Sequence, residues 1–173
     1  MEKGYVQIYT GNGKGKTTAA LGLITRAVGH NFKIFLCQFL KGRDYGELHT
    51  LQKFETVTYE RYGRGVFIKS KEFVTDEDKK LMREGYESLK NALLSGKFDI
   101  VIADEILGTL RYDLISVDEI KFLIKNKPET TELILTGRNA PDELIEMADL
   151  VTEMKEVKHY FQKGVMARKG IEK

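Results

Sequence analysis

The sequence predicts an α/β fold, with a mostly parallel central sheet flanked by helices. Apolar, strand-like runs alternate with helix-like runs along the chain, and a glycine-rich segment separates the first strand from the first helix. This alternation favours a parallel sheet, because a helix returns the chain to the edge where the next strand begins. With 173 residues, of which 42% are hydrophobic, the chain can bury a full core. Residues 1–173 are therefore expected to form a single domain.

The first half of the chain supplies three strands and one helix. Apolar and polar residues alternate over Tyr5-Val6-Gln7-Ile8-Tyr9, which indicates a strand at residues 4–10. A helix is expected at residues 16–29. The strand that follows, at 33–39, is almost entirely apolar, as is typical of the centre of a sheet. A third strand, at 56–61, alternates more clearly.

Capping signals mark two helices in the second half. Thr75 is followed by three acidic residues, which suit the positive end of a helix expected to run to about residue 95. Ser116 and Glu119 form a capping box for the next helix, and Pro128 lies just past its end.

The remaining strands lie between and after these helices. A fourth strand is expected at 99–103, a fifth at 132–136 and a sixth at 150–154, all of them rich in apolar residues. Pro141 is placed in the first turn of a last helix, on which three apolar residues share one face: Leu144, Ile145 and Ala148. The mixed, basic segment 155–173 gives no prediction.

The glycine-rich segment reads Thr10-Gly11-Asn12-Gly13-Lys14-Gly15-Lys16-Thr17-Thr18. Its glycines let the backbone turn its N–H groups inward, and the following helix adds free N–H groups and the positive end of its dipole. Lys16 would place a cation on the outer phosphates, and Thr17 a hydroxyl on Mg2+. Thr10 stands where the usual G-x-x-x-x-G-K-[ST] pattern begins with glycine. The layout predicts a P-loop NTPase-like (RecA-like) fold that binds a triphosphate through Gly11, Asn12, Gly13, Lys14, Gly15, Lys16, Thr17 and Thr18.

Two acidic residues, Asp104 and Glu105, end the fourth strand. In open α/β sheets, ligands bind at the carboxyl ends of the strands, so both acids are expected beside the phosphate loop. Carboxylate oxygens there suit Mg2+, which bridges phosphates and keeps several waters. Thr17, Asp104 and Glu105 are therefore the candidate metal ligands, and the spacing leaves open which acid binds the ion directly.

Basic and aromatic residues follow other strands. Arg138 ends the fifth strand and could grip the triphosphate, or be a solvated surface residue. Lys41 and Arg43, with Glu47 nearby, follow the second strand and could contact phosphate or another acidic group, or form a solvated loop. The segment 59–68 could line a flat, largely apolar ligand or act as a lid, whereas its composition alone favours core packing and a turn.

The charge and cysteine content exclude several classes of protein. A net charge of +2 argues against a dedicated nucleic-acid binder, and no apolar run approaches the ~20 residues of a membrane span. The sequence enters its first strand without room for a signal peptide. The single cysteine, Cys37, excludes an internal disulfide and is expected to be buried and inert. These features favour a cytoplasmic protein.

Several segments together resemble one family, the ATP:corrinoid adenosyltransferases of the phosphate-loop type. The resemblance extends in collinear order over nearly the whole chain. Its matching segments are 11–20, 38–42 and 46–47, Asp104-Glu105, Thr136-Gly137-Arg138-Asn139-Ala140-Pro141, Ala148-Asp149, Lys158-His159 and 164–172. The phosphate loop with the Thr-Gly-Arg-Asn-Ala-Pro segment and the Lys-His…Gly-Ile-Glu tail is far more specific than the loop alone.

The resemblance implies transfer of the 5′-deoxyadenosyl group of ATP to the Co(I) of a corrinoid, with release of inorganic triphosphate. A flavoprotein or another reductant would supply Co(I), and the family is often dimeric, so a homodimer is expected. Carried over by position, Lys16, Thr17 and Glu105 are the candidate catalytic residues, Thr17 and Glu105 orient Mg2+, and Arg138 lies near the nucleotide. Five residues are assigned to the corrinoid: Lys41, Arg43, Glu47, Arg64 and Phe67.

One segment departs from the family. The corrinoid-facing segment often reads Gly-Phe-Thr-Trp in its members, whereas this chain has Gly65-Val66-Phe67-Ile68 and no tryptophan.

Two other functions stay open from the residues alone. One is an NTPase or kinase that acts at the terminal phosphate, and the other is a carrier that binds ATP and corrinoid without turnover.

Overall fold

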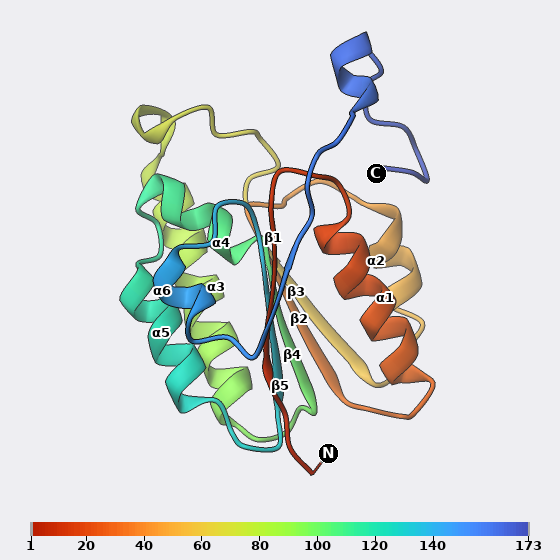
Figure 1. Cartoon of the computed structure of the whole chain (residues 1–173), viewed down its shortest axis with the longest axis vertical. Helices are drawn as coiled ribbons and strands as arrows, with labels where there is room; N and C mark the ends of the chain where they lie inside the picture. Colours follow the sequence, from red (N-terminus) through yellow and green to blue (C-terminus); the bar gives the residue numbers. More distant parts are fainter. Residues whose placement is uncertain (1, 173) are drawn as a thin grey trace.

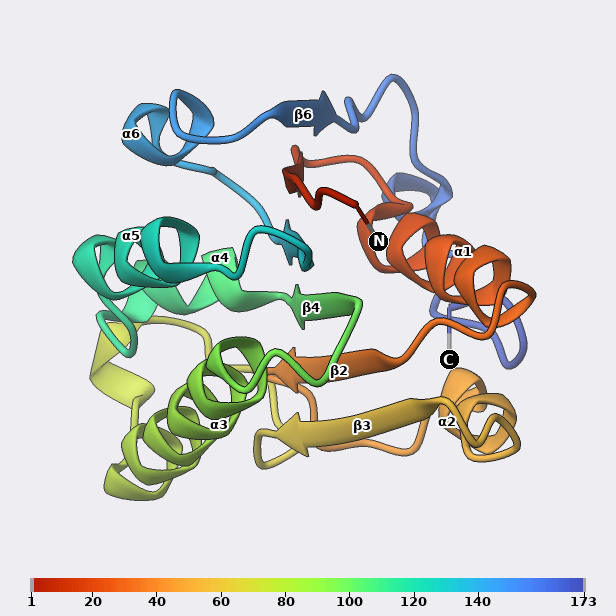
Figure 2. The ribbon, with the colours of Figure 1, turned by 90° about the horizontal axis from the view of Figure 1, so that it is seen from below.

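The computed structural model describes residues 2–172 and contains one six-stranded sheet whose strands are all parallel (Figures 1 and 2). Its strands are β1 (Val6–Thr10), β2 (Ile34–Phe39), β3 (Val57–Tyr62), β4 (Ile100–Asp104), β5 (Glu132–Thr136) and β6 (Leu150–Glu153). They lie in the order β3-β2-β4-β5-β1-β6, so β5 separates the strand before the phosphate loop from the strand that carries the two acids.

Helices cover both faces of the sheet and make three layers (Figure 1). One face carries α1 (Lys16–Val28) and α2 (Gly46–Leu51), and the other carries α3 (Asp76–Leu94), α4 (Ile106–Thr109), α5 (Val117–Asn126) and α6 (Asp142–Ile145). Short 3-10 turns are η1 (Lys71–Phe73), η2 (Leu110–Tyr112) and η3 (Tyr160–Lys163). None of the helices within residues 2–172 is long and apolar enough to cross a bilayer.

The core lies on the two faces of the sheet. The side chains of Ile8, Phe39 and Val101 pack with α3, α5 and α6 on one face, and those of Ile34 and Ile102 pack with α1 on the other. Every residue of β2, β4 and β5 is buried, which confirms that nearly continuous apolar runs mark central strands.

All six predicted strands are confirmed, with ends shifted by two residues at most. The predicted capping box at Ser116 is confirmed, because its side chain accepts a hydrogen bond from the backbone of Glu119. Thr75 caps α3 as predicted, accepting from the backbone of Asp78, and Asp78 completes a second capping box there. Polar side chains satisfy the free N–H groups at these helix starts, so the signal is local and can be read from sequence.

The prediction for the last helix was wrong in two respects. Pro141 is the N-cap, with ψ of 145°, and α6 forms a single turn that ends at Ile145. Ala148 therefore lies beyond the helix. The chain leaves the helical path because Asp149 forms two hydrogen bonds with the backbone of Val6 in β1. Its carboxylate accepts from the Val6 N–H at 2.8 Å, and its own N–H donates to the Val6 carbonyl at 2.9 Å. These contacts start β6.

Parallel strands bring their carboxyl ends to a single edge of the sheet, the upper edge in Figure 1. Two segments rise above that edge on opposite sides of the sheet. One is the loop between β3 and α3, and the other is the segment 155–172, which we call the strap. The strap contains η3 and then returns toward the start of α1 (Figure 1).

Candidate functional site

The phosphate loop connects β1 to α1 in a backbone conformation that requires glycine. Gly11 has φ of 99° and Gly15 of 120°, in the left-handed region that side chains disfavour. A Cβ on Gly13 would lie 2.6 Å from the Met154 carbonyl oxygen, so the third glycine is needed because the chain leaving β6 passes directly over the loop. The loop's N–H groups and the start of α1 form the concave surface expected of a phosphate cradle.

Lys16 lies across the mouth of this loop. Its ammonium donates to the carbonyl oxygens of Gly11 and Gly13, both at 2.8 Å, and the residue is buried. Burial lowers the pKa of Lys16 and the charge of Arg138 adds to this, whereas Glu105 and Asp104 oppose it. The cation is thus held where phosphate oxygens would replace the two carbonyls.

Asp104 is the centre of the polar network below the loop. It is completely buried, and each carboxylate oxygen accepts two hydrogen bonds. Oδ1 accepts from Thr17 at 2.9 Å and Thr136 at 2.8 Å, and Oδ2 accepts from Gln38 at 3.0 Å and Lys41 at 2.6 Å. A buried carboxylate requires this degree of satisfaction. The network joins α1 to three strands and fixes the hydroxyl of Thr17.

Glu105 follows with a left-handed backbone, φ of 62°, which is uncommon for a residue with a side chain. Its N–H donates to Thr136 Oγ1 at 2.8 Å. A Cβ on Gly108 would lie 2.6 Å from Glu105 Oε1, so the glycine makes room for the carboxylate. Burial raises the pKa of Glu105, as does Asp104, while Lys41, Lys16 and Arg138 oppose the shift. Within residues 2–172 its carboxylate accepts no hydrogen bond and faces the cavity described below.

Thr10, the departure from the usual motif, has a structural role. Its hydroxyl oxygen accepts a hydrogen bond from the N–H of Ala140 at 3.1 Å. This contact ties the end of β1 to the loop that carries Arg138. Gly137, with φ of 142°, lets the same loop pack against Leu107, because a Cβ there would lie 2.7 Å from the Leu107 Cβ.

A cavity of about 1210 Å3 opens above these residues at the carboxyl edge of the sheet. One side is the phosphate loop with Glu105 and Arg138. The other side is largely apolar and comes from the loop after β3 and from α4 with η2. The lining on that side includes Val66, Phe67, Ile68, Leu107, Leu110 and Tyr112. Pockets for drug-sized ligands have volumes of about 300–1,000 Å3, so this cavity is larger than one such ligand requires.

The residues assigned to the corrinoid do not all reach this cavity. Lys41, Glu47 and Phe67 line it, and the Phe67 side chain is 79% exposed. Arg43 and Arg64 lie outside the lining. Arg43 donates to the Gly65 carbonyl at 2.7 Å, and Arg64 forms a two-pronged ion pair with the Asp78 carboxylate, with both contacts at 2.7 Å. These two arginines stabilise the loop after β3 and the start of α3.

The residues assigned to ATP converge better. Asn12, Gly13, Lys14, Gly15, Lys16, Thr17, Thr18 and Arg138 all line the cavity. Lys14 is engaged elsewhere, however: its ammonium contacts Glu172 Oε1 at 2.9 Å. Gly11 is outside the lining and instead lies against the backbone of Met154.

Segment 59–68, which could line a flat apolar ligand, supplies Val66, Phe67 and Ile68 to the wall, whereas the rest of the wall and the strap were not predicted as parts of the site. Tyr45, Leu107, Leu110, Arg111 and Tyr112 line the cavity, as do four strap residues: His159, Gly170, Ile171 and Glu172. The Tyr112 hydroxyl donates to the Ile68 carbonyl at 2.7 Å and joins the two parts of the wall. The apolar run directly after Glu105 was the one available signal, because α4 is too short to show a helical period.

The polar groups fit a magnesium ion. Thr17, Asp104 and Glu105 present a hydroxyl and two carboxylates, and the Lys41 ammonium lies 3.2 Å from Thr17 Oγ1 and 2.6 Å from Asp104 Oδ2. The Lys41 ammonium is thus a cation already held by two of these three groups. Among residues 2–172 no group of three or more His, Cys, Asp or Glu could form a metal cage. An open set of oxygens is what Mg2+ uses when phosphates and water complete its shell.

The sequence matches known proteins over its whole described length. A sequence model of the family described as ATP:corrinoid adenosyltransferase BtuR/CobO/CobP matches residues 2–172. The chain is 38% identical over 175 residues to a corrinoid adenosyltransferase of a Sinorhizobium species, covering 99% of this chain and 81% of that protein. It is 36% identical over 172 residues to the corrinoid adenosyltransferase of Escherichia coli K12, covering 99% and 86%.

The fold also resembles a solved structure, that of the flagellar accessory protein FlaH from Methanocaldococcus jannaschii. The TM-score is 0.60, and the match covers 88% of this chain and 72% of FlaH at 13% sequence identity. At this identity the likeness concerns the fold alone. Together with the parallel sheet order, it confirms the predicted P-loop NTPase-like, RecA-like α/β fold.

Proposed function

This chain belongs to the ATP:corrinoid adenosyltransferase family, and from that premise we propose how its residues carry out the reaction. The enzyme transfers the 5′-deoxyadenosyl group of ATP to the Co(I) of a corrinoid and releases inorganic triphosphate. A cobalt–carbon bond forms as the bond between C5′ and the triphosphate oxygen breaks. The cobalt supplies both electrons of the new bond, and the triphosphate leaves with the pair of the old one.

The observation that carries this proposal is the cavity of about 1210 Å3, in which a phosphate cradle faces an apolar wall. An enzyme acting only at the terminal phosphate needs the cradle and a small acceptor site. Attack at C5′ requires instead that a large second substrate reach the sugar end of the nucleotide. The apolar wall from the loop after β3 and from η2 provides a surface for such a substrate.

In this proposal the phosphate loop binds a leaving group. Negative charge grows on the triphosphate as the C5′–O bond breaks, and inward N–H groups with the Lys16 cation stabilise that charge. Mg2+, when bound at Thr17 and the two acids, would supply further positive charge to the same oxygens. Asp104 holds Thr17 in place, Glu105 faces the bound nucleotide, and Arg138 completes the positive lining. A nucleophilic cobalt needs no general base.

The residues that we propose for the corrinoid are Lys41, Glu47 and Phe67, which line the cavity together with Val66 and Ile68. Phe67 projects from the loop after β3 and is the most exposed aromatic residue of the wall. A flat ring pressed against an aromatic side chain gains both apolar burial and stacking. The register Gly65-Val66-Phe67-Ile68 would therefore place one aromatic face against the corrin.

Three further proposals concern the wider assembly. We propose that residues 1–173 act as a single domain and that a flavoprotein or another reductant supplies Co(I). We also propose a homodimer, which the exposure of edge strand β6 supports. All four β6 residues are exposed, with Leu150 at 44% and Val151 at 38%, and a second copy would cover such apolar residues. Sedimentation analysis would test the dimer.

The reaction itself is tested by following the fate of ATP. The purified protein is incubated anaerobically with MgATP and a chemically reduced corrinoid. Inorganic triphosphate together with a light-sensitive Co–C product establishes the transferase. ADP and phosphate, formed at the same rate with or without corrinoid, would instead identify a P-loop NTPase. A bound corrinoid without any product would identify a carrier.

A further inference from the structure

Met154, the residue that precedes the strap, is in direct contact with the phosphate loop. Past the end of β6, the Met154 N–H donates to the Thr10 carbonyl at 2.8 Å, and the Gly13 N–H donates to the Met154 carbonyl at 2.6 Å. The loop is therefore hydrogen-bonded, backbone to backbone, to the residue from which the strap starts. Any displacement of the strap at this point would be transmitted to the cradle.

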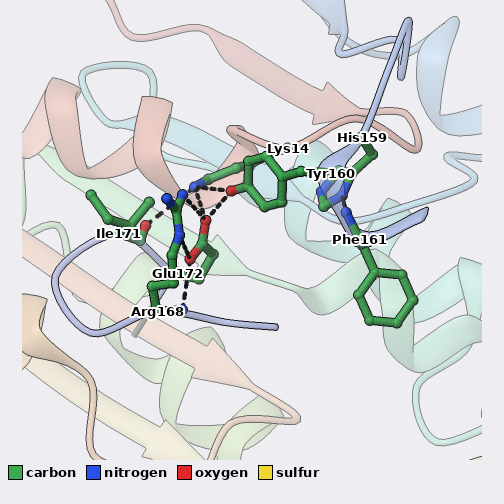
Figure 3. A network of polar contacts seen from close by, with 7 residues as sticks. All are labelled: Lys14, His159, Tyr160, Phe161, Arg168, Ile171 and Glu172. Atoms are coloured by element: carbon green, nitrogen blue, oxygen red, sulfur yellow. Dashed lines mark hydrogen bonds and ion pairs between the residues drawn. The ribbon is translucent and has the colours of Figure 1, made fainter. Parts of the chain in front are cut away.

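The far end of the strap returns to the same loop through one carboxylate (Figure 3). Glu172 Oε1 accepts from the Lys14 ammonium at 2.9 Å, from the Tyr160 hydroxyl and from the Arg168 guanidinium at 3.3 Å. Glu172 Oε2 accepts from the Arg168 N–H at 2.8 Å. Lys14 also donates to the Ile171 carbonyl at 3.3 Å. The strap thus closes on itself and is fastened to the loop at Lys14.

Exposed ion pairs taken singly contribute little to stability, but networks that share one charged group are the exception. Here the Glu172 side chain is only 17% exposed, against 40% for Lys14. The Arg168 guanidinium also lies over the Tyr160 ring, 4.9 Å from its centre. Several donors therefore hold the Glu172 carboxylate in one position, and this fixes the end of the strap against the phosphate loop.

The seated strap forms part of the cavity wall. His159, Gly170, Ile171 and Glu172 line the cavity on the phosphate-loop side, across from the loop after β3. Ile171 is 56% exposed and lies beside the opening that a bound nucleotide would fill. A wall at this position limits the access of water to the triphosphate and to the reacting C5′.

We propose that Lys14 and Glu172 are positioning residues that seat the strap on the phosphate loop, and that the seated strap is required for tight binding of the nucleotide. Lys14 then acts through the strap and is not a ligand of the phosphates, although it lies within the motif. This inference deepens the proposed function, because it takes the nucleotide site of the adenosyltransferase as the site that the strap completes.

Reversal of the charge pair separates the two roles of Lys14. We expect Lys14→Glu and Glu172→Lys each to weaken MgATP binding at least tenfold in calorimetry without corrinoid. The double variant Lys14→Glu/Glu172→Lys should recover most of the affinity, because it restores the ion pair with its direction reversed. If Lys14 binds phosphate directly, the double variant stays as weak as Lys14→Glu, and the proposal is overturned.

The single variant Glu172→Lys is a second, independent test of whether Glu172 acts by seating the strap. It makes the surroundings of the loop more positive, so simple electrostatics predicts tighter binding of the anionic nucleotide. If the variant instead unseats the strap, we expect weaker binding of the nucleotide and faster tryptic cleavage after Lys163, Arg168 or Lys169. Tighter binding, or an unchanged cleavage rate, would overturn the proposal. Tyr160→Phe, which removes one donor to Glu172, should shift both readouts in the same direction by a smaller factor.

The matched control reverses an exposed pair on α3, Lys80 and Glu84, whose charged atoms lie 3.9 Å apart. Lys80→Glu/Glu84→Lys should leave MgATP binding and strap cleavage unchanged. Adenosyl transfer is measured separately on the wild-type protein. If charge reversal acts as expected but no Co–C product forms, the proposal for the strap is supported and the proposed function is contradicted. If the product forms but charge reversal changes nothing, the proposed function is supported and the proposal for the strap is contradicted.

Discussion

At the scale of single residues, the position at which the motif departs from its pattern is held by a hydrogen bond. Thr10 is buried, and its hydroxyl oxygen accepts from the N–H of Ala140 at 3.1 Å. A glycine at this position would leave that N–H without its partner. The contact joins β1 to the segment that carries Arg138, so a residue that weakens the sequence match strengthens the site.

We therefore predict that restoring the motif glycine destabilises the protein. Thr10→Gly should cost about 1–2 kcal/mol in the free energy of unfolding, because a partly buried donor loses its acceptor and glycine adds backbone entropy to the unfolded chain. Urea unfolding measures the change. Thr10→Ser keeps the hydroxyl and should lie close to wild type. Equal stability of the glycine and serine variants would contradict the role given to this hydrogen bond.

The polar site residues show what sequence can and cannot supply at this scale. Lys16, Thr17, Asp104 and Glu105 were predicted to meet, because a motif and a strand end define their positions along the chain. The engagement of Lys14 by Glu172 was not predictable, since the two residues are 158 positions apart and only the folded chain brings them together. The same holds for Arg64 and Asp78: an arginine looks the same in sequence whether it binds a ligand or an adjacent carboxylate.

At the scale of elements, two glycines inside helices allow the effect of helix propensity on stability to be distinguished from the effect of packing. Gly22 lies on the exposed face of α1, and a Cβ there would meet nothing within 4 Å. Gly85 lies in α3, and a Cβ there would lie 2.8 Å from the Tyr62 ring and 3.0 Å from Phe39. The same substitution should thus have opposite effects in the two helices.

Gly22→Ala should stabilise the protein by about 0.5–1 kcal/mol, because alanine has the higher helix propensity and the site has room. Gly85→Ala should destabilise it, since α3 would have to move away from β2 and β3. Thermal unfolding of both variants measures the effect, and about 2–4 °C of shift per kcal/mol is expected at this chain length. A stabilised Gly85→Ala variant would show that α3 does not pack this closely.

The start of α3 carries a pH-dependent contribution to stability. Burial of Asp78 works to raise its pKa, but the Arg64 guanidinium and the Thr75 N–H and hydroxyl outweigh this and hold the pKa below its usual value. The folded protein thus binds the proton less well than the unfolded chain. The stabilisation is therefore present above the unfolded pKa and is lost as the pH falls through the folded one.

Asp78→Asn should reveal this contribution. Wild type should be more stable than the variant at neutral pH, and the two should converge as the pH falls below about 4, where an unfolded aspartate becomes protonated. Urea unfolding at a series of pH values between neutral and acidic gives the difference directly. A stability difference that stays constant over this range would mean that the charge of Asp78 contributes nothing and only its shape matters.

At the scale of the whole molecule, the sequence predicted the sheet and one half of the site. Alternating and continuous apolar runs identify strands, capping boxes identify helix starts, and parallel strands bring the motif and the acids to one edge. The wall residues from α4 and η2, and the strap, escaped prediction because they consist of short turns without a period. They are held by contacts such as Tyr112 to Ile68 and Glu172 to Lys14, which join distant segments.

The thermal stability of the whole molecule should also show whether the site binds the proposed leaving group, inorganic triphosphate. A ligand that binds only the folded state stabilises it by about 2.7 kcal/mol at one hundred times its dissociation constant, equivalent to about 5–10 °C for a chain of this length. If the phosphate loop holds the departing triphosphate, inorganic triphosphate with Mg2+ should raise the unfolding temperature nearly as much as MgATP. Adenosine should have little effect, because it lacks every group that the loop and Arg138 bind.

Lys16→Ala is the control for this effect, because it removes the cation that the loop holds at its mouth. Both shifts should shrink together in that variant, since the same interaction serves substrate and product. A large shift with ADP and none with triphosphate would mean that the cradle recognises a nucleoside diphosphate, as a protein acting at the terminal phosphate would. Equal shifts with ATP and triphosphate would leave the adenosine end free to be presented to the corrinoid, which is the geometry that attack at C5′ requires.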